Sequence, residues 1–415
     1  MTTAPVSLDR ARSDYAALVG RGLSLDITRG KPSPRQLDLA NELLALPGGD
    51  VHTAEDGTDV RNYGGLKGLL ELRRILAGPL QVPVEQLLAA GNSSLELMHD
   101  VVVQALLSRV PGSERRWADE PRVAFLCPVP GYDRHFALTD RFGIEMIQVP
   151  MTDDGPDMDV VERLVAEDAG IKGIWCVPKY SNPSGVTYSD ETVRRLASMT
   201  AAAGDFRVFW DNAYAVHHLT EEETPLADFL ALCAEHGNPD RALVFGSTSK
   251  ITLAGSGVSF LGASEANIAW WLGVVAKRTI GPDKVNQLRH AFFLKDEDGV
   301  RAHMRRHAGI IAPKFAAVER ILAEELGDSG LASWTEPIGG YFISLTVPEG
   351  TAKEVVRLAK EAGIALTPAG ATHPRGEDPA DAIIRIAPTY PDLAEVEEAI
   401  RGLAVCVRLA AAQRA

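Results

Sequence analysis

The chain has 415 residues, of which 46% are hydrophobic and 24% are charged, and its formal net charge is −14. This length suits two or three domains, and the composition is typical of a soluble globular enzyme. The acidic balance disfavours a nucleic-acid partner, because nucleic-acid phosphates attract a basic face. No stretch reaches the roughly 18 apolar residues that a membrane span needs, so we expect neither a nucleic acid nor a membrane as a partner.

The cysteines favour a reducing compartment. Cys127, Cys176, Cys233 and Cys406 show no paired or metal-like spacing, and each lies among apolar neighbours. Residues 1–15 lack the apolar core of a signal peptide. We therefore expect a cytoplasmic protein without a metal site.

The first part of the chain predicts a helix and then two glycine-rich loops. The helix is expected over residues 8–20, and the Gly-Pro turn of residues 28–34 follows it and displays Arg29 and Lys31. The second loop surrounds Tyr63 with glycines and leads into a helix over residues 69–77. Such glycines indicate either a ligand loop or close packing at a plain helix entry.

A possible anion site comes next. An apolar run at residues 87–90 is followed by Gly-Asn-Ser-Ser and by a helix that reaches residue 106. The amide groups at a helix start, together with Ser93 and Ser94, can bind a phosphate. Helix capping alone would also explain the two serines.

Strands and helices then alternate as far as residue 250. Strands are expected at residues 123–127, 144–149, 171–177, 206–210 and 241–245, and helices at residues 159–169 and 189–203. This alternation predicts a parallel sheet with helices on both faces. Ligands bind such sheets outside the carboxyl ends of the strands. The sequence places these polar residues there: Tyr132, Arg134, Asn182, Asp211, Tyr214 and Lys250.

The last third of the chain predicts a smaller α+β domain. Helices are expected at residues 266–281, 300–326, 352–362 and 393–404, and strands at residues 339–346 and 382–387. The predicted organisation is an N-terminal segment (residues 1–55) that joins the small domain, a large domain (residues 56–298) and a small C-terminal domain (residues 299–415).

Lys250 and Asp211 suggest a specific chemistry. Lys250 follows an apolar strand through a Ser-Thr-Ser turn, and Asp211 ends the preceding strand after two aromatic residues. A surface lysine and a capping aspartate are the ordinary alternatives. Pyridoxal phosphate needs a lysine for its imine, a carboxylate for its ring nitrogen and a cradle for its phosphate.

Four motifs carry a family resemblance: residues 182–185 (Asn-Pro-Ser-Gly), residues 211–214 (Asp-Asn-Ala-Tyr), residues 247–250 (Ser-Thr-Ser-Lys) and Arg385. In this order and spacing they resemble the fold-type-I pyridoxal-phosphate aminotransferases of class I/II. Residues 28–34, 130–136 and 249–255 are most similar to the actinobacterial-type aspartate aminotransferase branch. The resemblance implies an α/β fold, with a mostly parallel seven-stranded sheet in the large domain and a small α+β domain.

The resemblance also implies how the cofactor is held. Lys250 would be the Schiff-base lysine and the base that moves the substrate proton, and Asp211 would hold the ring nitrogen. Asn182 and Tyr214 would bind the ring oxygen. The remaining residues implied for the cofactor are Tyr132 on the ring face, Asn92, Ser93, Ser94, Ser247 and Ser249 around the phosphate, and Tyr63, which would reach the phosphate of a second subunit.

Substrate binding is implied by the same comparison. Arg385 would pair with the substrate α-carboxylate, with Asn182 and Gly30 beside it; a solvent-facing arginine is the alternative. Arg29 or Arg134 would bind a side-chain carboxylate, and Arg29 is slightly preferred.

One position departs from the family pattern. Gly257 stands where many relatives carry a phosphate-binding arginine. The phosphate would then depend on hydroxyl and amide groups, or on another cation such as Lys31 or Arg134.

The resemblance implies a ping-pong aspartate aminotransferase. It would transfer the amino group of L-aspartate to 2-oxoglutarate, giving oxaloacetate and L-glutamate. Its partners would be small amino acids and 2-oxo acids, and a second copy of the chain in a homodimer with shared sites. The alternatives are an aromatic, kynurenine or 2-aminoadipate aminotransferase, a pyridoxal-phosphate β-lyase, and a regulator with an aminotransferase-like ligand domain, which the acidic charge disfavours.

Overall fold

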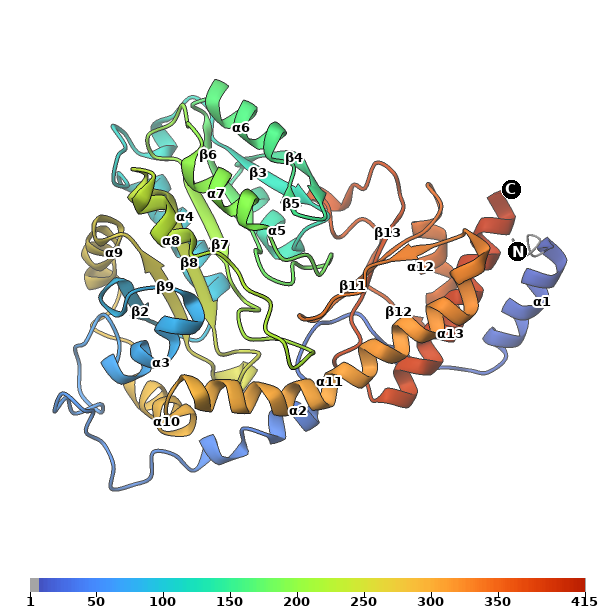
Figure 1. Ribbon diagram of the computed structural model, residues 1–415, viewed down its shortest axis with the longest axis horizontal. Helices are drawn as coiled ribbons and strands as arrows, with labels where there is room; N and C mark the ends of the chain where they lie inside the picture. Colours follow the sequence, from blue (N-terminus) through green and yellow to red (C-terminus); the bar gives the residue numbers. More distant parts are fainter. Residues whose placement is uncertain (1–6, 415) are drawn as a thin grey trace.

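A computed structural model of the chain describes residues 7–414, which form one large sheet, two small sheets and the helices that cover them (Figure 1). Met1–Val6, part of the segment inspected for a signal peptide, and Ala415 lie outside the described residues.

The large sheet has eight strands in the order β2-β9-β8-β7-β6-β3-β4-β5. Four neighbouring pairs in its centre are parallel, whereas β9 runs antiparallel to β2 and β8, and β5 runs antiparallel to β4. The predicted α/β class with a mostly parallel sheet is confirmed. The strands are β2 (Leu87–Ala89), β3 (Ala124–Val129), β4 (Glu145–Thr152), β5 (Gly155–Pro156), β6 (Ile171–Cys176), β7 (Arg207–Asp211), β8 (Ala242–Ser247) and β9 (Ser259–Ala263).

The eighth strand is one more than the sequence predicts. β5 has only two residues: the chain turns back along β4 at Asp153 and Asp154, and Gly155, with a φ of 122°, is the first residue of the returning strand. Residues other than glycine rarely adopt this backbone conformation. A two-residue strand has no alternating pattern that sequence periodicity could reveal.

The strands of the large sheet are buried on both faces, which explains their nearly continuous apolar sequences. Along β7, Trp210 packs into the hydrophobic cluster on one face, and Phe209 packs into the cluster on the other. The first face is covered by α3 (Leu70–Leu80), α6 (Met158–Glu167), α7 (Asp190–Ser198), α8 (Phe229–Glu235) and α10 (Lys284–Leu294). The second is covered by α4 (Ser94–Leu107), α5 (Asp133–Arg141) and α9 (Glu265–Arg278).

A separate hydrophobic cluster holds the two small sheets (Figure 1). One sheet is antiparallel, in the order β10-β11-β13, and the other pairs β1 with β12 in parallel, which places the N-terminal segment beside the C-terminal third. The exact domain boundaries stay a prediction. The elements are β1 (Leu25–Asp26), β10 (Ser333–Trp334), β11 (Ile343–Thr346), β12 (Ile364–Ala365) and β13 (Ile383–Ile386), with α1 (Leu8–Val19), α2 (Pro34–Asp38), α12 (Ala352–Glu361) and α13 (Leu393–Arg414).

The strand expected at residues 339–346 is shorter than predicted, because β11 begins only at Ile343. Gly340 has a φ of 83°, and a Cβ at Gly339 would lie 2.2 Å from the ring of Tyr180. These glycines let the chain turn against Tyr180 before the strand starts. The contact joins the small sheet to the loop after β6.

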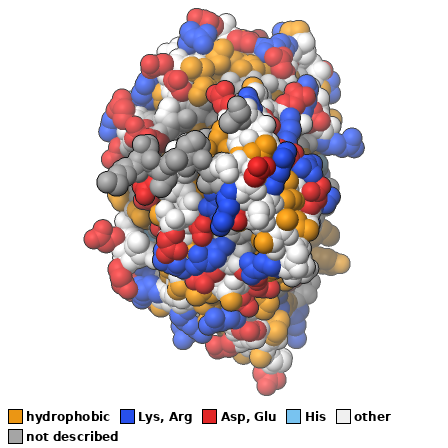
Figure 2. All heavy atoms as spheres, turned by 90° about the vertical axis from the view of Figure 1, so that its right-hand side faces the viewer, with side chains coloured by type: hydrophobic (Ala, Val, Ile, Leu, Met, Phe, Trp, Pro, Cys, Tyr) orange, Lys and Arg blue, Asp and Glu red, His pale blue; other side chains and the backbone are white. Residues whose placement is uncertain are grey.

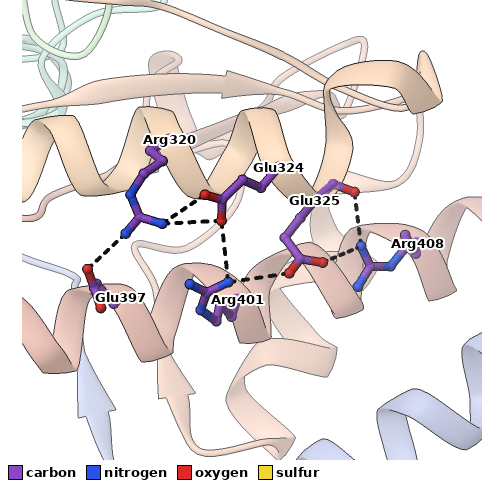
Figure 3. Close-up of polar contacts among 6 residues, drawn as sticks. All are labelled: Arg320, Glu324, Glu325, Glu397, Arg401 and Arg408. Atoms are coloured by element: carbon purple, nitrogen blue, oxygen red, sulfur yellow. Dashed lines mark hydrogen bonds and ion pairs between the residues drawn. The ribbon is translucent and has the colours of Figure 1, made fainter.

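Helix α11 (Glu297–Leu326) connects the two regions. Asp296 is its N-cap residue, whose side chain accepts a hydrogen bond from the amide of Gly299 at 2.8 Å, and the helix packs along α13. Figure 3 shows ion pairs that link the two helices through Arg320, Glu324 and Glu325 on α11 and Glu397, Arg401 and Arg408 on α13.

The surface carries mixed charge on the face shown in Figure 2, where Lys and Arg side chains lie among Asp and Glu side chains. Within residues 7–414, no helix is both long enough and apolar enough to cross a membrane.

Candidate active site

A cavity of about 190 Å³ lies at the carboxyl ends of the central strands. The cavity is lined by the ends of β7 and β8 and by the loops after β3 and β6, which is where a parallel sheet is expected to bind its ligand. The cavity brings together predicted residues that are far apart in the sequence: Ser93, Ser94, Tyr132, Asn182, Asp211, Tyr214, Ser247, Ser249 and Lys250.

Lys250 presents its amine to this cavity. Its Nζ lies 4.9 Å from the centre of the Tyr214 ring. Burial lowers the pKa of Lys250 below its ordinary value of 10.5, although the negative charge of Asp211 opposes the shift. This amine is therefore neutral at a lower pH than a surface lysine would be, which suits a base or a nucleophile.

Asp211 ends β7 and is held by a histidine. Its Oδ2 accepts a hydrogen bond from Nε2 of His135 at 3.0 Å, and the ring of His135 stacks on Trp175 with centres 4.5 Å apart. Oδ1 of Asp211 is buried and has no hydrogen-bond partner among the described residues. A buried carboxylate oxygen without a donor is costly, so the site is complete only when a ligand supplies an N–H or O–H group.

Aromatic and amide groups form the walls. The ring of Tyr132 lies edge-on to His135, with centres 4.9 Å apart. Burial raises the pKa of both Tyr132 and Tyr214, so both phenols keep their protons at neutral pH and can donate hydrogen bonds. The buried side chain of Asn182 accepts a hydrogen bond from Nη1 of Arg385 at 3.3 Å.

Hydroxyl groups gather at one end of the cavity. Ser247 Oγ and Ser249 Oγ are 2.6 Å apart, and Ser93 caps the start of α4, where Ser94 is the first helical residue. Asn92 is exposed, and its backbone carbonyl accepts a hydrogen bond from Ser249 Oγ at 3.4 Å; its contact with a phosphate stays a prediction. Hydroxyls beside a helix N-terminus suit a phosphate group.

Lys250 is the only cation among the described residues that line the cavity. Neither alternative phosphate cation joins it: Nζ of Lys31 lies 3.8 Å above the ring of Tyr390, and Arg134 is exposed. The structure also explains Gly257. A Cβ at this position would lie 2.9 Å from Oγ and 3.0 Å from the amide nitrogen of Ser249, so any larger residue would force the loop to shift.

Arg385 does not face solvent. It lies on β13 with a side chain only 8% exposed, and its guanidinium lies 5.0 Å above the ring of Phe342. Besides Asn182, it contacts Asp133 at 2.9 Å and Thr367 at 3.5 Å. Its Nε is buried and has no partner among the described residues.

The loop that carries Arg29 lies against the surroundings of Arg385. Gly30 packs on Phe342, where a Cβ would lie 2.2 Å from the ring, and the carbonyl of Thr28 accepts a hydrogen bond from Thr367 at 2.8 Å. Arg29 itself is exposed and is not part of the cavity wall. The role of Arg29 or Arg134 toward a side-chain carboxylate stays a prediction.

Tyr63 lies outside the cavity, and its side chain is 79% exposed. Its contact with a second subunit stays a prediction.

Two functional candidates, His135 and Asp133, are absent from the predicted site residues. His135 lies in the first turn of α5, three positions after Tyr132, which is the N-cap residue of this helix. Its closeness in the sequence to Tyr132, a predicted site residue, could have indicated a place near Asp211. Nothing local to Asp133 indicates its pairing with Arg385, which lies 252 residues away.

Comparison with known proteins identifies relatives of the whole chain. A family model described as "Aspartate amino-transferase" matches residues 2–415. An aspartate aminotransferase of Corynebacterium glutamicum is 54% identical over 399 residues, which cover 96% of this chain and 92% of that protein. The crystal structure of an aspartate transaminase from C. glutamicum aligns with a TM-score of 0.96 and 51% identity, covering 99% of this chain and 100% of that one.

A more distant structure shares the fold. The α-aminoadipate aminotransferase LysN of Thermus thermophilus, solved in complex with N-(5'-phosphopyridoxyl)-L-leucine, aligns with a TM-score of 0.76 at 21% identity over 98% of this chain and 100% of that one. The family model covers nearly the whole chain, and so does the C. glutamicum relative. This chain therefore belongs to the aspartate amino-transferase family.

Proposed function

We propose that the protein is a pyridoxal-phosphate-dependent aspartate aminotransferase that transfers the amino group of L-aspartate to 2-oxoglutarate by a ping-pong mechanism. The observation that carries this proposal is a single cavity with three features: the amine of Lys250, the unpaired buried oxygen of Asp211 and the serine hydroxyls beside α4. The relatives that are more than half identical support aspartate as the amino donor.

The residues present fit this cofactor. Oδ1 of Asp211 is a hydrogen-bond acceptor without a donor among the described residues, and the N–H group of a protonated pyridine ring would supply that donor. Ser93, Ser94, Ser247 and Ser249 offer hydroxyl and amide donors for the phosphate, and Tyr132 offers an aromatic face for the ring. The cofactor, when bound, supplies an electron sink for the negative charge that develops at the substrate Cα.

Lys250 performs the proton transfer in this proposal. Its buried amine is available in the neutral form, so it can take a proton from the substrate Cα and return it elsewhere. Asp211 would accept a hydrogen bond from the ring nitrogen of the cofactor, and His135 fixes the orientation of that carboxylate. Tyr214 lies beside the amine and, with Asn182, can donate a hydrogen bond to the ring oxygen.

Arg385 binds the substrate α-carboxylate. A guanidinium 8% exposed in a low-dielectric wall attracts a carboxylate more strongly than a surface arginine does. This contact fixes the rotation of the substrate and thereby which bond at Cα faces the electron sink. We assign Arg29, and as the second candidate Arg134, to the side-chain carboxylate of aspartate.

The proposed assembly is a cytoplasmic homodimer. The exposed Tyr63 would complete the phosphate site of the partner subunit, and the four buried, unpaired cysteines fit a reducing compartment.

The test is an absorbance spectrum of the purified protein with pyridoxal phosphate, before and after addition of L-aspartate. The bound cofactor absorbs at roughly 360–430 nm and its amino form at about 330 nm. We expect L-aspartate to convert the first band to the second, and 2-oxoglutarate to reverse the change. A band that responds only to an aromatic donor would contradict aspartate specificity, and no cofactor band would contradict the whole proposal.

A further inference from the structure

Arg385 is paired with a carboxylate of the protein itself. Its Nη1 donates a hydrogen bond to Oδ1 of Asp133 at 2.9 Å, and the same nitrogen contacts Oδ1 of Asn182, a residue of the cavity wall. Asp133 therefore occupies the position where an arginine and an asparagine of the site meet. A carboxylate bound there by the protein competes with any carboxylate that arrives from solution.

This pairing has an electrostatic cause. Arg385 is nearly buried, and its other described contacts, with Asn182 and Thr367, are with neutral groups. A buried guanidinium without a counter-charge is strongly disfavoured. Asp133 is the one acid within ion-pair distance of Arg385 among the described residues.

Asp133 can also leave this position at little cost. Its side chain is 33% exposed, and it lies in the first turn of α5. A carboxylate in the first turn of a helix is stabilised by the helix dipole, so the displaced side chain keeps favourable surroundings in solvent. Arg385, in contrast, belongs to a strand and is enclosed by Phe342 and Thr367.

We propose that Asp133 is an internal stand-in for the substrate α-carboxylate, which binds by displacing Asp133 from Arg385. The inference rests on the proposed function, because it takes Arg385 as the carboxylate-binding residue. Since one carboxylate replaces another, the exchange contributes little net binding by itself. A ligand must therefore gain affinity from its other groups, which disfavours simple anions and favours substrates that also contact the rest of the site.

The experiment uses calorimetry to measure how tightly succinate, an unreactive dicarboxylate, binds to the unmodified holoenzyme and to its variants. We expect Asp133→Asn to bind succinate about tenfold more tightly than the unmodified enzyme, because the internal competitor has lost its charge. Asp140→Asn is the matched control, since it removes the same charge from the same helix where Asp140 pairs with the exposed Arg375. Its affinity should stay within about twofold of the unmodified enzyme.

A second readout separates displacement from a merely structural role. Without ligand, Asp133→Asn leaves the charge of Arg385 unpaired, so the Tm of this variant should lie below that of the unmodified enzyme. Saturating succinate should remove this difference in Tm, because its carboxylate then pairs with Arg385 in both proteins. KM for both L-aspartate and 2-oxoglutarate should fall together, because both carry an α-carboxylate. Asp133→Ser provides the same comparison if the asparagine variant does not fold.

Weaker or unchanged succinate binding in both Asp133 variants would overturn the inference and make Asp133 a support for Arg385. If the unmodified enzyme binds no succinate and accepts no amino donor, the proposed function fails, and the inference fails with it. Binding by the unmodified enzyme without a gain in the variants overturns this inference alone.

Discussion

His135 and Asp211 form a buried pair in which one carboxylate oxygen is satisfied and the other is left open. Nε2 of His135 donates to Oδ2 at 3.0 Å, while Oδ1 has no partner within residues 7–414. The stacking of His135 on Trp175 fixes the ring, and the ring fixes the carboxylate. The protein thus holds a negative charge in one orientation and reserves its second oxygen for a ligand.

The first prediction concerns His135→Phe, which keeps a flat ring against Trp175 and removes the hydrogen-bond donor. Asp211 then loses its fixed orientation, and we expect kcat to fall roughly tenfold or more. Steady-state kinetics with L-aspartate measure the effect. His99→Phe, at an exposed position on α4, is the control. Activity of His135→Phe within about twofold of the unmodified enzyme would contradict the orienting role.

The carboxyl-end residues could be predicted from sequence because each follows directly on an apolar strand. Asp211 ends β7, and Lys250 follows the end of β8 by three residues. In a parallel sheet these ends share one edge, so the strand pattern already places the side chains near one another. The alternation of strand and helix therefore carries most of the information about this part of the site.

The rest of the site depends on contacts between distant elements. The pairing of Arg385 with Asp133 joins β13 to α5, and the packing of Gly339 on Tyr180 ends the predicted strand early. Neither contact leaves a local pattern, because each depends on how the small sheets lie against the large one. Sequence spacing describes single elements and not the approach of one region to another.

The second prediction concerns Gly257→Arg, which restores the residue that many relatives have. Because its Cβ would lie about 3 Å from three atoms of Ser249, the loop must shift, and such overpacking costs about 1–3 kcal/mol. We expect pyridoxal phosphate to bind at least several-fold more weakly, as measured by fluorescence titration of the apoprotein.

The matched control is Gly255→Arg, because a Cβ at Gly255 meets nothing within 4 Å. It adds the same charge to the same loop without the clash, and it should leave the affinity for the cofactor near that of the unmodified protein. Tighter binding by Gly257→Arg would show that the loop can accommodate the side chain and that the cradle lacks a cation.

The third prediction concerns Lys250→Met in the apoprotein. The pKa of Lys250 is lowered by burial, so the unfolded chain holds the proton more tightly than the folded chain does, and this costs stability at every pH below about 10.5. We expect the methionine variant to have a Tm about 1–3 °C higher at pH 7. The gain should shrink as the pH rises toward 10.5 and disappear only above it, where the amine is neutral in both the folded and the unfolded chain.

Lys277→Met is the control for this comparison, because Lys277 is exposed on α9 and its removal changes the net charge equally. A Tm of Lys250→Met equal to or below that of the unmodified apoprotein at pH 7 would show that the amine is stabilised where it lies.

The fourth prediction concerns His307, a buried histidine of α11. Nδ1 of His307 accepts a hydrogen bond from Gln36 at 3.2 Å, and the same Gln36 amide donates to Tyr341 at 3.0 Å. Burial lowers the pKa of His307 to about 3. Protonation of Nδ1 would place its N–H group against the N–H group of the Gln36 amide, and this hydrogen bond would be lost. The unfolded chain takes up this proton near pH 6.5, so stability falls as the pH drops below that value.

We expect this one residue to account for about 2 kcal/mol of the loss between pH 7 and pH 5. Urea unfolding at both pH values measures it, and His307→Gln should flatten the pH dependence by that amount. His99→Gln, which replaces an exposed histidine, should leave the dependence unchanged. An equal slope in His307→Gln and the unmodified protein would show that the network tolerates the charge.

The fifth prediction concerns the ion pairs between α11 and α13 (Figure 3). Glu325 contacts Arg408 at 2.9 Å and Arg401 at 3.6 Å, and Arg408 is only 17% exposed. Glu325→Gln should therefore lower the free energy of unfolding by about 0.5–1 kcal/mol in low salt, which is more than an isolated surface pair contributes. In 0.5 M salt the loss should shrink, because screening weakens partly exposed pairs.

Glu191→Gln provides the matched control, since Glu191 pairs with Arg194 on α7 and both side chains are at least half exposed. Its effect should stay below about 0.3 kcal/mol at either salt concentration. A double-mutant cycle between Glu325→Gln and Arg408→Met isolates the pair from the other contacts of each residue. A coupling energy near zero would mean that α11 and α13 are held together by their apolar contacts alone, with Phe315, Ile321 and Leu322 of α11 packed against the core of the small sheets.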